Sequence, residues 1–373
     1  MSGPIAVIGA GGFVGTRLVE SLVLEGSSDI RAVVRAYRSL AGLSRFGSAV
    51  DWRIADAENP AALVQALQGA GTAVNLTTGT PASILRSTRT ILEACVAAKV
   101  PRLIHLSSAV VFGEVASSVI DDDSPPLMRH WMPYARAKAA AERWLREHLP
   151  TSPCQVVVLR PGIVWGVRSP HTLQAVKALR EKNAYLAGRG DGVFNSIYID
   201  NLVAAILACC AHQGAVRGFY NVADQETVSW RDFYAAFAPS CDYDMGQMPS
   251  VSIERFPWSL RAVIEYVQLL PAVNGFYHRL KTSLPDTLKS RLKALLADGY
   301  NYGHTASTYN RKPVVDREVW HLQRVRYKLP TAKFCKNFSF TPPVTFEDGV
   351  RRTVAWMEFV GYESLSKQLV TAS

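Results

Sequence analysis

The sequence of 373 residues lacks any hydrophobic run long enough to cross a membrane. Its longest uninterrupted apolar stretch, residues 202–211, has about half of the roughly 20 residues that a membrane-spanning helix needs. The first residues also lack the basic group that precedes the apolar core of a secretory signal. These absences predict a cytoplasmic protein without a transmembrane segment.

Cysteine pairs with the spacing of a metal site are missing as well. The six cysteines are Cys95, Cys154, Cys209, Cys210, Cys241 and Cys335. They are expected to be reduced thiols in the protein interior, and no metal site is predicted. Internal repeats and low-complexity segments are absent. With 48% hydrophobic and 19% charged residues, the chain is predicted to be neither disordered nor fibrous.

The charge that is present is unevenly distributed. The formal net charge is +10, but residues 1–250 hold 23 basic and 21 acidic side chains, whereas residues 251–373 hold 18 and 10. A polyelectrolyte, a membrane surface or an anionic small substrate would each suit this excess. No nucleic-acid reading motif accompanies it, so no nucleic-acid partner is predicted, and peripheral membrane contact stays open.

Short apolar runs alternate with helical patterns along the first 160 residues. The predicted strands are residues 5–8, 30–34, 50–54, 72–76, 103–106 and 156–159, and helical patterns include residues 13–24, 61–67 and 84–98. Apolar strands alternating with helices predict an α/β fold of the Rossmann type, a doubly wound parallel sheet covered on both faces. Residues 196–199 and 218–222 are candidates for further strands of this sheet.

The composition changes near residue 249 to proline, aromatic and basic residues, with amphipathic helical patterns at residues 260–270 and 288–296. Two parts are therefore predicted. Residues 1–165 and 195–222 form an NAD(P)-binding domain, and residues 166–194 and 223–373 form a smaller, mostly helical C-terminal substrate lobe.

A glycine-rich turn follows the first predicted strand. Gly9, Gly12 and Gly15 have the G-x-x-G-x-x-G spacing between a strand and a helix, which suits a dinucleotide pyrophosphate. Twenty residues after Gly15 stands Arg35, and no acid follows until Asp51. Because Arg accommodates a 2′-phosphate whereas an acid binds the free 2′-hydroxyl, the sequence predicts NADP as the cofactor, with NAD as the alternative.

Tyr134 and Lys138 are four residues apart on a predicted helix, which places a phenol and an ammonium group on one face. A neighbouring cation favours the phenolate that a proton-transfer step needs. Tyr277 and Lys281 have the same spacing but lie in the basic region, and we treat that second pair as chance.

Together these motifs resemble those of the extended short-chain dehydrogenase/reductases, the NAD-dependent epimerase/dehydratase family. The resemblance covers most of the chain. Its further elements are Asp56 in Ile-Ala-Asp-Ala, Asn75-Leu-Thr-Thr, Ser107-Ser108-Ala-Val-Val-Phe-Gly113, Leu159-Arg-Pro161 with Gly166, Tyr198-Ile-Asp200, Gly218-Phe-Tyr-Asn221-Val and Thr345-Phe-Glu-Asp-Gly349.

The resemblance implies an enzyme that transfers a hydride at a secondary alcohol or ketone carbon. It assigns Ser108 to polarise the substrate oxygen, Tyr134 to pass the proton, and Lys138 to orient the ribose and tune Tyr134. The residues implied in binding the cofactor are Gly9, Gly12, Phe13, Val14, Gly15, Arg35, Asp56, Ala57, Leu76, Thr77, Ser107, Tyr134, Lys138 and Pro161.

Several positions depart from the sugar-nucleotide branches that this resemblance includes. Ala109 and Val110 stand where 4,6-dehydratases carry Asp-Glu, so a 4,6-dehydratase is not expected. Ile163 replaces an Asn that holds the diphosphate in many epimerases, and Asn195 replaces a frequent Arg.

Three functions follow from these observations. The first is an epimerase or oxidoreductase of a nucleotide-activated sugar, which the basic second part would suit. The second is an NADPH-dependent reductase or hydroxysteroid-type dehydrogenase of an apolar alcohol or ketone. The third is a non-enzymatic NADP-sensing binding protein. The partner predicted in the first two cases is a small-molecule substrate, and the resemblance implies a homodimer.

Overall fold

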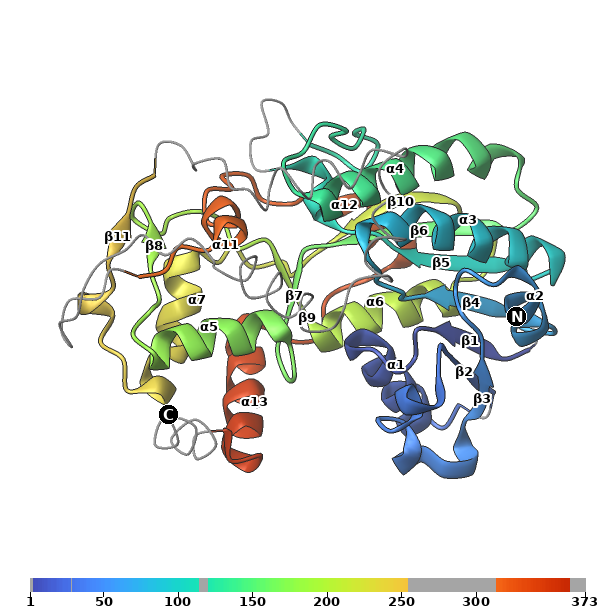
Figure 1. Ribbon diagram of the computed structural model, residues 1–373, viewed down its shortest axis with the longest axis horizontal. Coiled ribbons are helices and arrows are strands. Elements are labelled where there is room, and N and C mark those ends of the chain that lie inside the picture. Colours follow the sequence, from blue (N-terminus) through green and yellow to red (C-terminus); the bar gives the residue numbers. More distant parts are fainter. Residues whose placement is uncertain (1–2, 28, 114–119, 254–312, 363–373) are drawn as a thin grey trace, which may run out of the picture.

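The computed structural model describes residues 3–27, 29–113, 120–253 and 313–362. A seven-stranded parallel sheet lies at its centre, in the order β10-β6-β5-β4-β1-β2-β3 (Figure 1). Its strands are β1 (Ile5–Ile8), β2 (Ile30–Val34), β3 (Asp51–Ile54), β4 (Thr72–Asn75), β5 (Arg102–Leu106), β6 (Gln155–Pro161) and β10 (Gly218–Val222). The strand order reverses between β1 and β4, which is where a doubly wound sheet opens a crevice for a ligand.

Helices cover both faces of this sheet, as the sequence predicted. One face carries α1 (Phe13–Leu24), α6 (Ile199–Ala211) and α12 (Ala332–Phe338). The other face carries α2 (Pro60–Leu67), α3 (Pro81–Ala97) and α4 (Pro133–His148). Figure 1 shows α3 and α4 on one side of the sheet and α1 and α6 on the other. The Rossmann-type fold class is therefore confirmed.

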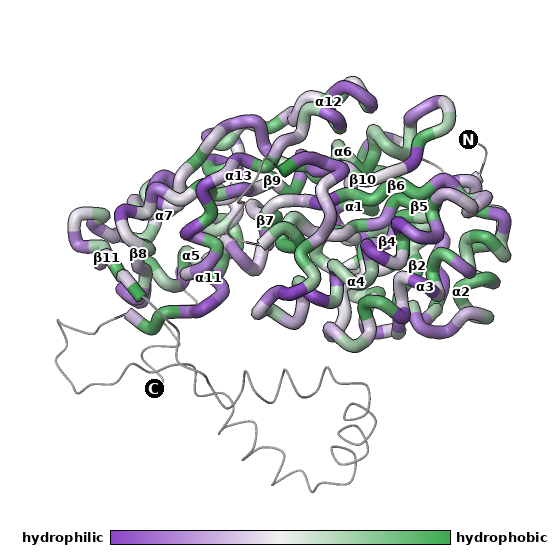
Figure 2. The backbone as a smooth tube through the Cα atoms, turned by 90° about the horizontal axis from the view of Figure 1, so that it is seen from above, coloured by the Kyte–Doolittle hydropathy of each residue, from purple (hydrophilic) through white to green (hydrophobic). Residues whose placement is uncertain are grey.

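The first strand shows why these apolar runs become central strands. Val7 points into the core on the α1 side, and Ala6 and Ile8 point into the core on the α2 side. All three side chains are almost completely buried. Each fully buried Val or Ile stabilises the fold by about 1.5–3 kcal/mol, which favours a strand buried on both faces. Figure 2 shows the hydrophobic strands enclosed by more hydrophilic outer segments.

The two additional predicted strands have different outcomes. β10 pairs with β6 and extends the central sheet, as predicted. β9 (Ser196–Tyr198) does not join it: it pairs with β7 (Ile163–Trp165) in a separate two-stranded sheet. The chain leaves the central sheet after Pro161 and continues directly into β7. Because β9 pairs with β7, it lies outside the central sheet, in the second part of the molecule.

A second core forms beyond this small sheet. It contains residues of α5 (Pro170–Arg180), β8 (Leu186–Ala187), α7 (Trp230–Phe237) and α13 (Phe346–Phe359), and we call this part the second lobe. β8 pairs with β11 (Ser250–Val251), and α11 (Arg317–Leu322) lies at its edge. Within the described residues, the short 3-10 helices are Tyr37–Leu40, Ser44–Ala49, Ala109–Phe112, Leu149–Thr151, Pro239–Cys241 and Met245–Gln247.

The last part of the chain contributes to both cores. α12 packs on β10 of the central sheet, although residues 332–338 belong to the range predicted for the substrate lobe. The two amphipathic patterns predicted at 260–270 and 288–296, and the pair Tyr277 and Lys281, lie outside the described residues. None of the helices in the described ranges combines the length and the apolar character needed to span a membrane.

Candidate active site

A glycine turn links β1 to α1 at the carboxyl edge of the sheet. Gly9 has a φ of +87°, a conformation that favours glycine, and a Cβ there would lie 3.2 Å from the carbonyl carbon of Leu76. Gly15 lies so close to the turn that an added Cβ would be 2.3 Å from the Gly9 carbonyl oxygen. The backbone of the loop after β1 therefore lies directly against the backbone of the loop after β4, with no room for a side chain at Gly9.

The N-terminus of α1 is open to an anion. Gly12 precedes the helix without a side-chain cap, and the first turn contains no acidic residue. The first N–H groups of a helix lack partners within it and lie at the positive end of its dipole. Phe13 and Val14 pack against the core of the second lobe, so this helix end lies where the two parts meet. The glycine spacing predicts a pyrophosphate here, and the unpartnered N–H groups of this helix end would suit such an anion.

The residues expected to face the adenosine lie at the ends of the neighbouring strands β2 and β3. Arg35 follows β2, is exposed, and forms no ion pair within the described part of the chain. Asp56 follows β3, and its carboxylate accepts a hydrogen bond from the backbone N–H of Glu58 at 2.9 Å. Ala57 packs against the core beside α2. Arg35 therefore has a side chain available for a phosphate.

A buried polar chain follows β4. Asn75 Oδ1 accepts hydrogen bonds from the backbone N–H of Thr77 at 3.0 Å and from its hydroxyl at 2.7 Å. The amide nitrogen of Asn75 therefore donates to Nδ1 of His105, 2.9 Å away. Burial and the nearby Lys138 charge lower the pKa of His105 to about 3, so its imidazole is neutral. His105 is therefore a buried histidine of the protein core.

The two serines at the end of β5 have different surroundings. The Ser107 hydroxyl is buried and donates to Glu142 Oε1 at 2.5 Å. Ser108 is half-buried, and its Oγ accepts a hydrogen bond from the backbone N–H of Val110 at 3.3 Å. An oxygen that accepts this bond keeps its own hydrogen for another acceptor. Ser108 thus has the donor that the polarising role requires.

Tyr134 and Lys138 lie on the first turns of α4, on the side that faces β5. Lys138 Nζ is 5.9 Å from the centre of the Tyr134 ring and donates to the carbonyl oxygen of Leu106 at 2.8 Å. Lys138 is buried, and Tyr134 is half-buried. The structure therefore brings both side chains of the predicted pair to the end of the strand that carries Ser108.

The electrostatics of this pair differ from the simple expectation that Lys138 favours the phenolate. Burial, with a contribution from the Glu318 charge, raises the pKa of Tyr134 to about 12. Burial lowers the pKa of Lys138 to about 8, although the Glu142 charge opposes this effect. In the protein alone Tyr134 is a neutral phenol, because desolvation and the Glu318 charge both disfavour the phenolate.

Sequence reasoning did not find two groups near this pair. Glu142, one helical turn after Lys138, forms a fully buried ion pair with Arg160 of β6. Glu318 belongs to α11, which packs on the segment before Tyr134 because Arg317 lies over the Trp131 ring at 4.5 Å. An acid directly after the alanines that follow Lys138 was a local signal for Glu142, whereas only the fold brings Glu318 near Tyr134.

The two positions that depart from sugar-nucleotide enzymes have structural partners. Ile163 is half-buried and packs against the second core. Asn195 uses both ends of its side-chain amide: Nδ2 donates to the carbonyl oxygen of Tyr327 at 2.8 Å, and Oδ1 accepts from the N–H of Leu329 at 2.7 Å. Pro161, the last residue of β6, is buried beside β10.

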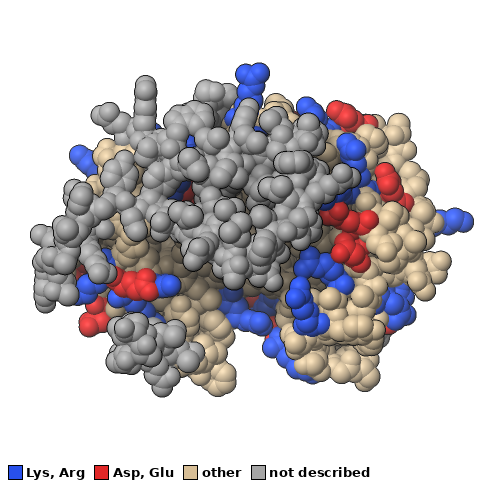
Figure 3. All heavy atoms as spheres, viewed as in Figure 1, with Lys and Arg blue, Asp and Glu red and all other residues tan. Residues whose placement is uncertain are grey.

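Most basic residues of the described C-terminal part interact with other groups of the same chain. Arg326 pairs with Asp191 at 2.6 Å, and Lys333 pairs with Asp123 at 2.8 Å. Lys328 donates to the carbonyl oxygen of Asp224 at 2.7 Å. Figure 3 shows basic and acidic side chains next to one another at several places on one face of the molecule. In this part of the chain, the excess of basic residues serves internal contacts.

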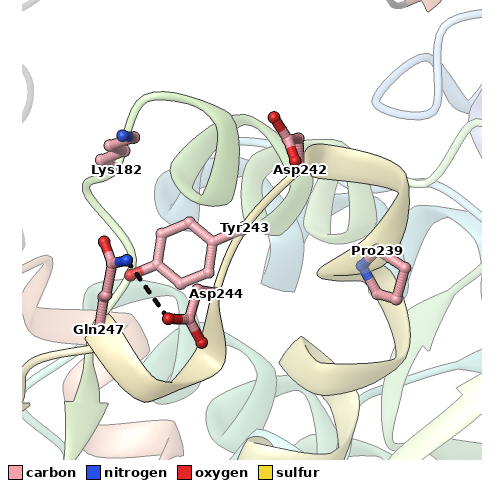
Figure 4. A pocket seen from close by; sticks show the side chains of 6 residues that line it. All are labelled: Lys182, Pro239, Asp242, Tyr243, Asp244 and Gln247. Atoms are coloured by element: carbon pink, nitrogen blue, oxygen red, sulfur yellow. Dashed lines mark hydrogen bonds between the residues drawn. The ribbon is translucent and has the colours of Figure 1, made fainter.

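A surface pocket lies in the second lobe, away from these residues (Figure 4). Lys182, Pro239, Asp242, Tyr243, Asp244 and Gln247 line it. Gln247 Nε2 donates to Asp244 Oδ2 at 3.3 Å across its wall. It contains none of the groups predicted to bind cofactor or to transfer a proton.

A parallel doubly wound sheet with a glycine turn at its crossover, and a Ser, Tyr and Lys set beside it, defines an NAD(P)-binding enzyme fold. The sequence model of the NAD dependent epimerase/dehydratase family matches residues 5–223, which is more than half of the chain. The chain belongs to this family and is an enzyme of the short-chain dehydrogenase/reductase superfamily. This sets aside the alternative of a non-enzymatic NADP-sensing protein.

Two curated relatives illustrate the range of the family. The chain is 28% identical over 245 residues to 2-alkyl-3-oxoalkanoate reductase of Shewanella oneidensis, a match covering 60% of this chain and 62% of the reductase. It is 25% identical over 261 residues to N-acetyl-alpha-D-glucosaminyl-diphospho-ditrans,octacis-undecaprenol 4-epimerase of Escherichia coli O157:H7, covering 66% of this chain and 75% of the epimerase.

Among solved structures, the fold is similar to that of dTDP-glucose 4,6-dehydratase of Bacillus anthracis in complex with NAD. The TM-score is 0.67 with 17% sequence identity, and the match covers 96% of this chain and 97% of the dehydratase. At this identity the likeness concerns the fold. It agrees with the Rossmann-type sheet described above.

Proposed function

We propose that this protein is a dehydrogenase or reductase of a largely apolar secondary alcohol or ketone, with NADP as its cofactor. One observation carries the choice of substrate class. The amide of Asn195, at the position where an Arg often contacts the diphosphate in related sugar enzymes, is used in bonds to Tyr327 and Leu329. With the apolar Ile163 at the second such position, both polar contacts to a diphosphate are missing.

The proposed mechanism assigns one task to each of three side chains. Ser108 donates its free hydroxyl hydrogen to the oxygen of the substrate. Tyr134 takes the proton of the alcohol during oxidation and returns it to the carbonyl oxygen during reduction. Lys138 binds the ribose hydroxyls and stabilises the phenolate. A nicotinamide held by these residues would supply or accept the hydride and, in its oxidised form, would contribute a positive charge to the site.

In this proposal the positive charge of the oxidised cofactor stabilises the Tyr134 phenolate. Because burial raises the pKa of Tyr134 to about 12 in the protein alone, the phenolate needs more positive charge than Lys138 provides. The phenol is then a base only when the oxidised cofactor is present. This arrangement couples proton transfer to cofactor binding.

The relative named as 2-alkyl-3-oxoalkanoate reductase supports an apolar ketone, since an alkyl chain flanks the carbonyl group in the substrate of that name. Purified protein should reduce members of a panel of 2-alkyl-3-oxoacids and sterol ketones with NADPH. The matched variant Tyr134→Phe should bind NADPH as the parent does and lose nearly all turnover. Full turnover by Tyr134→Phe would contradict the mechanism.

The preference for NADP rests on Arg35, which is exposed after β2 and has no acidic neighbour along the chain until Asp51. Arg35→Asp should weaken NADPH binding at least tenfold and leave NADH binding unchanged or stronger, as measured by fluorescence titration. An exposed arginine distant from the turn, Arg143→Asp on α4, is the control. An unchanged cofactor preference in Arg35→Asp would overturn the assignment.

A diphosphate-linked sugar is the second candidate, and the relative named as an undecaprenyl-diphosphate sugar 4-epimerase favours it. A thermal-shift panel with NADP present separates the two classes. UDP-sugars and a polyprenyl-diphosphate sugar form one arm, and apolar ketones form the other. Stabilisation by the sugar arm alone would place this candidate first.

A further inference from the structure

A fully buried ion pair lies directly behind the Ser, Tyr and Lys set. Glu142 of α4 and Arg160 of β6 are completely excluded from solvent and make three hydrogen bonds of 2.6 to 3.0 Å. Arg160 also donates to the backbone carbonyl of Asp122 at 2.9 Å. Replacing such a pair by apolar residues is often neutral or stabilising, so stability alone is a weak reason to keep it.

The same carboxylate reaches the end of β5. The Ser107 hydroxyl donates to Glu142 at 2.5 Å, and the Ser107 backbone N–H donates to the carbonyl oxygen of Leu159 at 2.7 Å. Ser108 is the next residue, and its φ of −163° continues the extended backbone. The position of the Ser108 hydroxyl is therefore determined by a residue that Glu142 holds.

The carboxylate also acts on Lys138. The two residues are one helical turn apart on α4, with only alanines between them, so that their side chains share a buried face. The ionisable groups that interact with Lys138 or Glu142 from the surrounding elements are His105 on β5, Tyr134 and Arg146 on α4, and Arg160 on β6. Of these groups, Glu142 is the carboxylate, and its negative charge favours the protonated form of Lys138.

We propose that Glu142 is a positioning residue of this enzyme, which through Arg160 and Ser107 holds the strand end that carries Ser108, and which places a negative charge beside the Lys138 ammonium group. The inference rests on the roles proposed above for Ser108 and Lys138. It concerns their geometry and charge, so it also applies to cofactor binding without turnover.

The first experiment measures NADPH affinity against pH in Glu142→Gln. Removing the carboxylate leaves burial unopposed, so Lys138 should lose its proton at lower pH, and the alkaline decline of affinity should move down by about one pH unit. The exposed Glu147→Gln on the same helix is the matched control and should match the parent. Folded Glu142→Gln with an unchanged decline would overturn the proposal.

Two further variants keep the proposal testable if Glu142→Gln fails to fold. Ser107→Ala removes the hydrogen bond to Glu142 but leaves the Glu142 charge beside Lys138, so it should lower kcat about tenfold while the alkaline decline of NADPH affinity stays unchanged. The double variant Glu142→Leu/Arg160→Met removes the pair without leaving a buried charge. It should show both effects, and a folded double variant with parental kcat and parental pH dependence would contradict the proposal.

These readouts separate this inference from the proposed function. If the parent binds NADPH but turns over no apolar ketone or sugar, the proposed function fails, whereas the pH dependence of binding still tests Glu142. If turnover is found and the binding profiles of parent and Glu142→Gln coincide, the proposed function stands and the role of Glu142 is refuted.

Discussion

The side-chain oxygen of Asn195 accepts a hydrogen bond from the backbone N–H of Leu329, at 2.7 Å. The same amide donates to the carbonyl oxygen of Tyr327 at 2.8 Å. A residue at the beginning of the β9 segment is thereby joined to the chain after α11, 134 positions later. The Asn195 side chain therefore links the β9 segment to the chain that follows α11.

Removal of the Asn195 amide should therefore weaken the fold. Asn195→Ala removes the hydrogen bonds that its side chain makes to the Tyr327 carbonyl and the Leu329 N–H, so the free energy of unfolding should fall by about 1–3 kcal/mol. Urea unfolding measures the change. Gln213→Ala, which truncates an exposed amide on another loop, should change stability by less than about 0.5 kcal/mol. Equal stability of the Asn195 variant and the parent would show that these two bonds contribute nothing.

Gly15→Ala should disturb the glycine turn. The new Cβ would lie 2.3 Å from the Gly9 carbonyl oxygen, so the backbone must shift, at a cost of about 1–3 kcal/mol, and NADPH affinity should fall. Gly42→Ala is the control, because its Cβ would meet only Thr16 at 3.7 Å, an ordinary contact. Thermal unfolding and fluorescence titration together test this prediction. Parental NADPH affinity in Gly15→Ala would refute it.

Glu318→Gln should lower the pKa of Tyr134. Burial is the main reason that this pKa is raised to about 12, and the Glu318 charge adds to it. Without that charge the phenolate forms at lower pH, so the acidic limb of kcat/KM for alcohol oxidation should move down. The exposed Glu347→Gln on α13 should leave the limb in place. An unmoved limb in Glu318→Gln would mean that α11 does not influence the site.

His105 should make stability fall in acid. Its folded-state pKa of about 3 lies below the ordinary value of 6.5, so the unfolded chain binds the proton first. The contribution of His105 is complete above pH 6.5 and is lost as the pH falls toward 3, with a slope of about 1.4 kcal/mol per pH unit. His105→Gln, compared with the parent by urea unfolding at pH 7 and pH 5, should show a smaller decline. Identical declines would contradict a neutral buried imidazole.

The central sheet was accessible from the sequence because its signals are local. β1 and β2 have the predicted bounds, and the glycine turn after β1 is visible as a spacing of three residues. The Tyr134 and Lys138 pair is also a local pattern, since one helical turn separates them. β9 was assigned to the wrong sheet because its pairing partner, β7, is decided by where the chain leaves β6.

The amino-acid sequence by itself determined the doubly wound sheet, the glycine turn after β1, and which hydroxyl, phenol and ammonium groups are candidates for the chemistry. Periodicity and spacing act over a few residues and can be read along the chain. Only the tertiary structure decided the partners of Glu142, the use of the Asn195 amide, and the approach of Glu318 to Tyr134. Those contacts join distant segments in a buried environment, where desolvation controls charge and every polar group requires a partner.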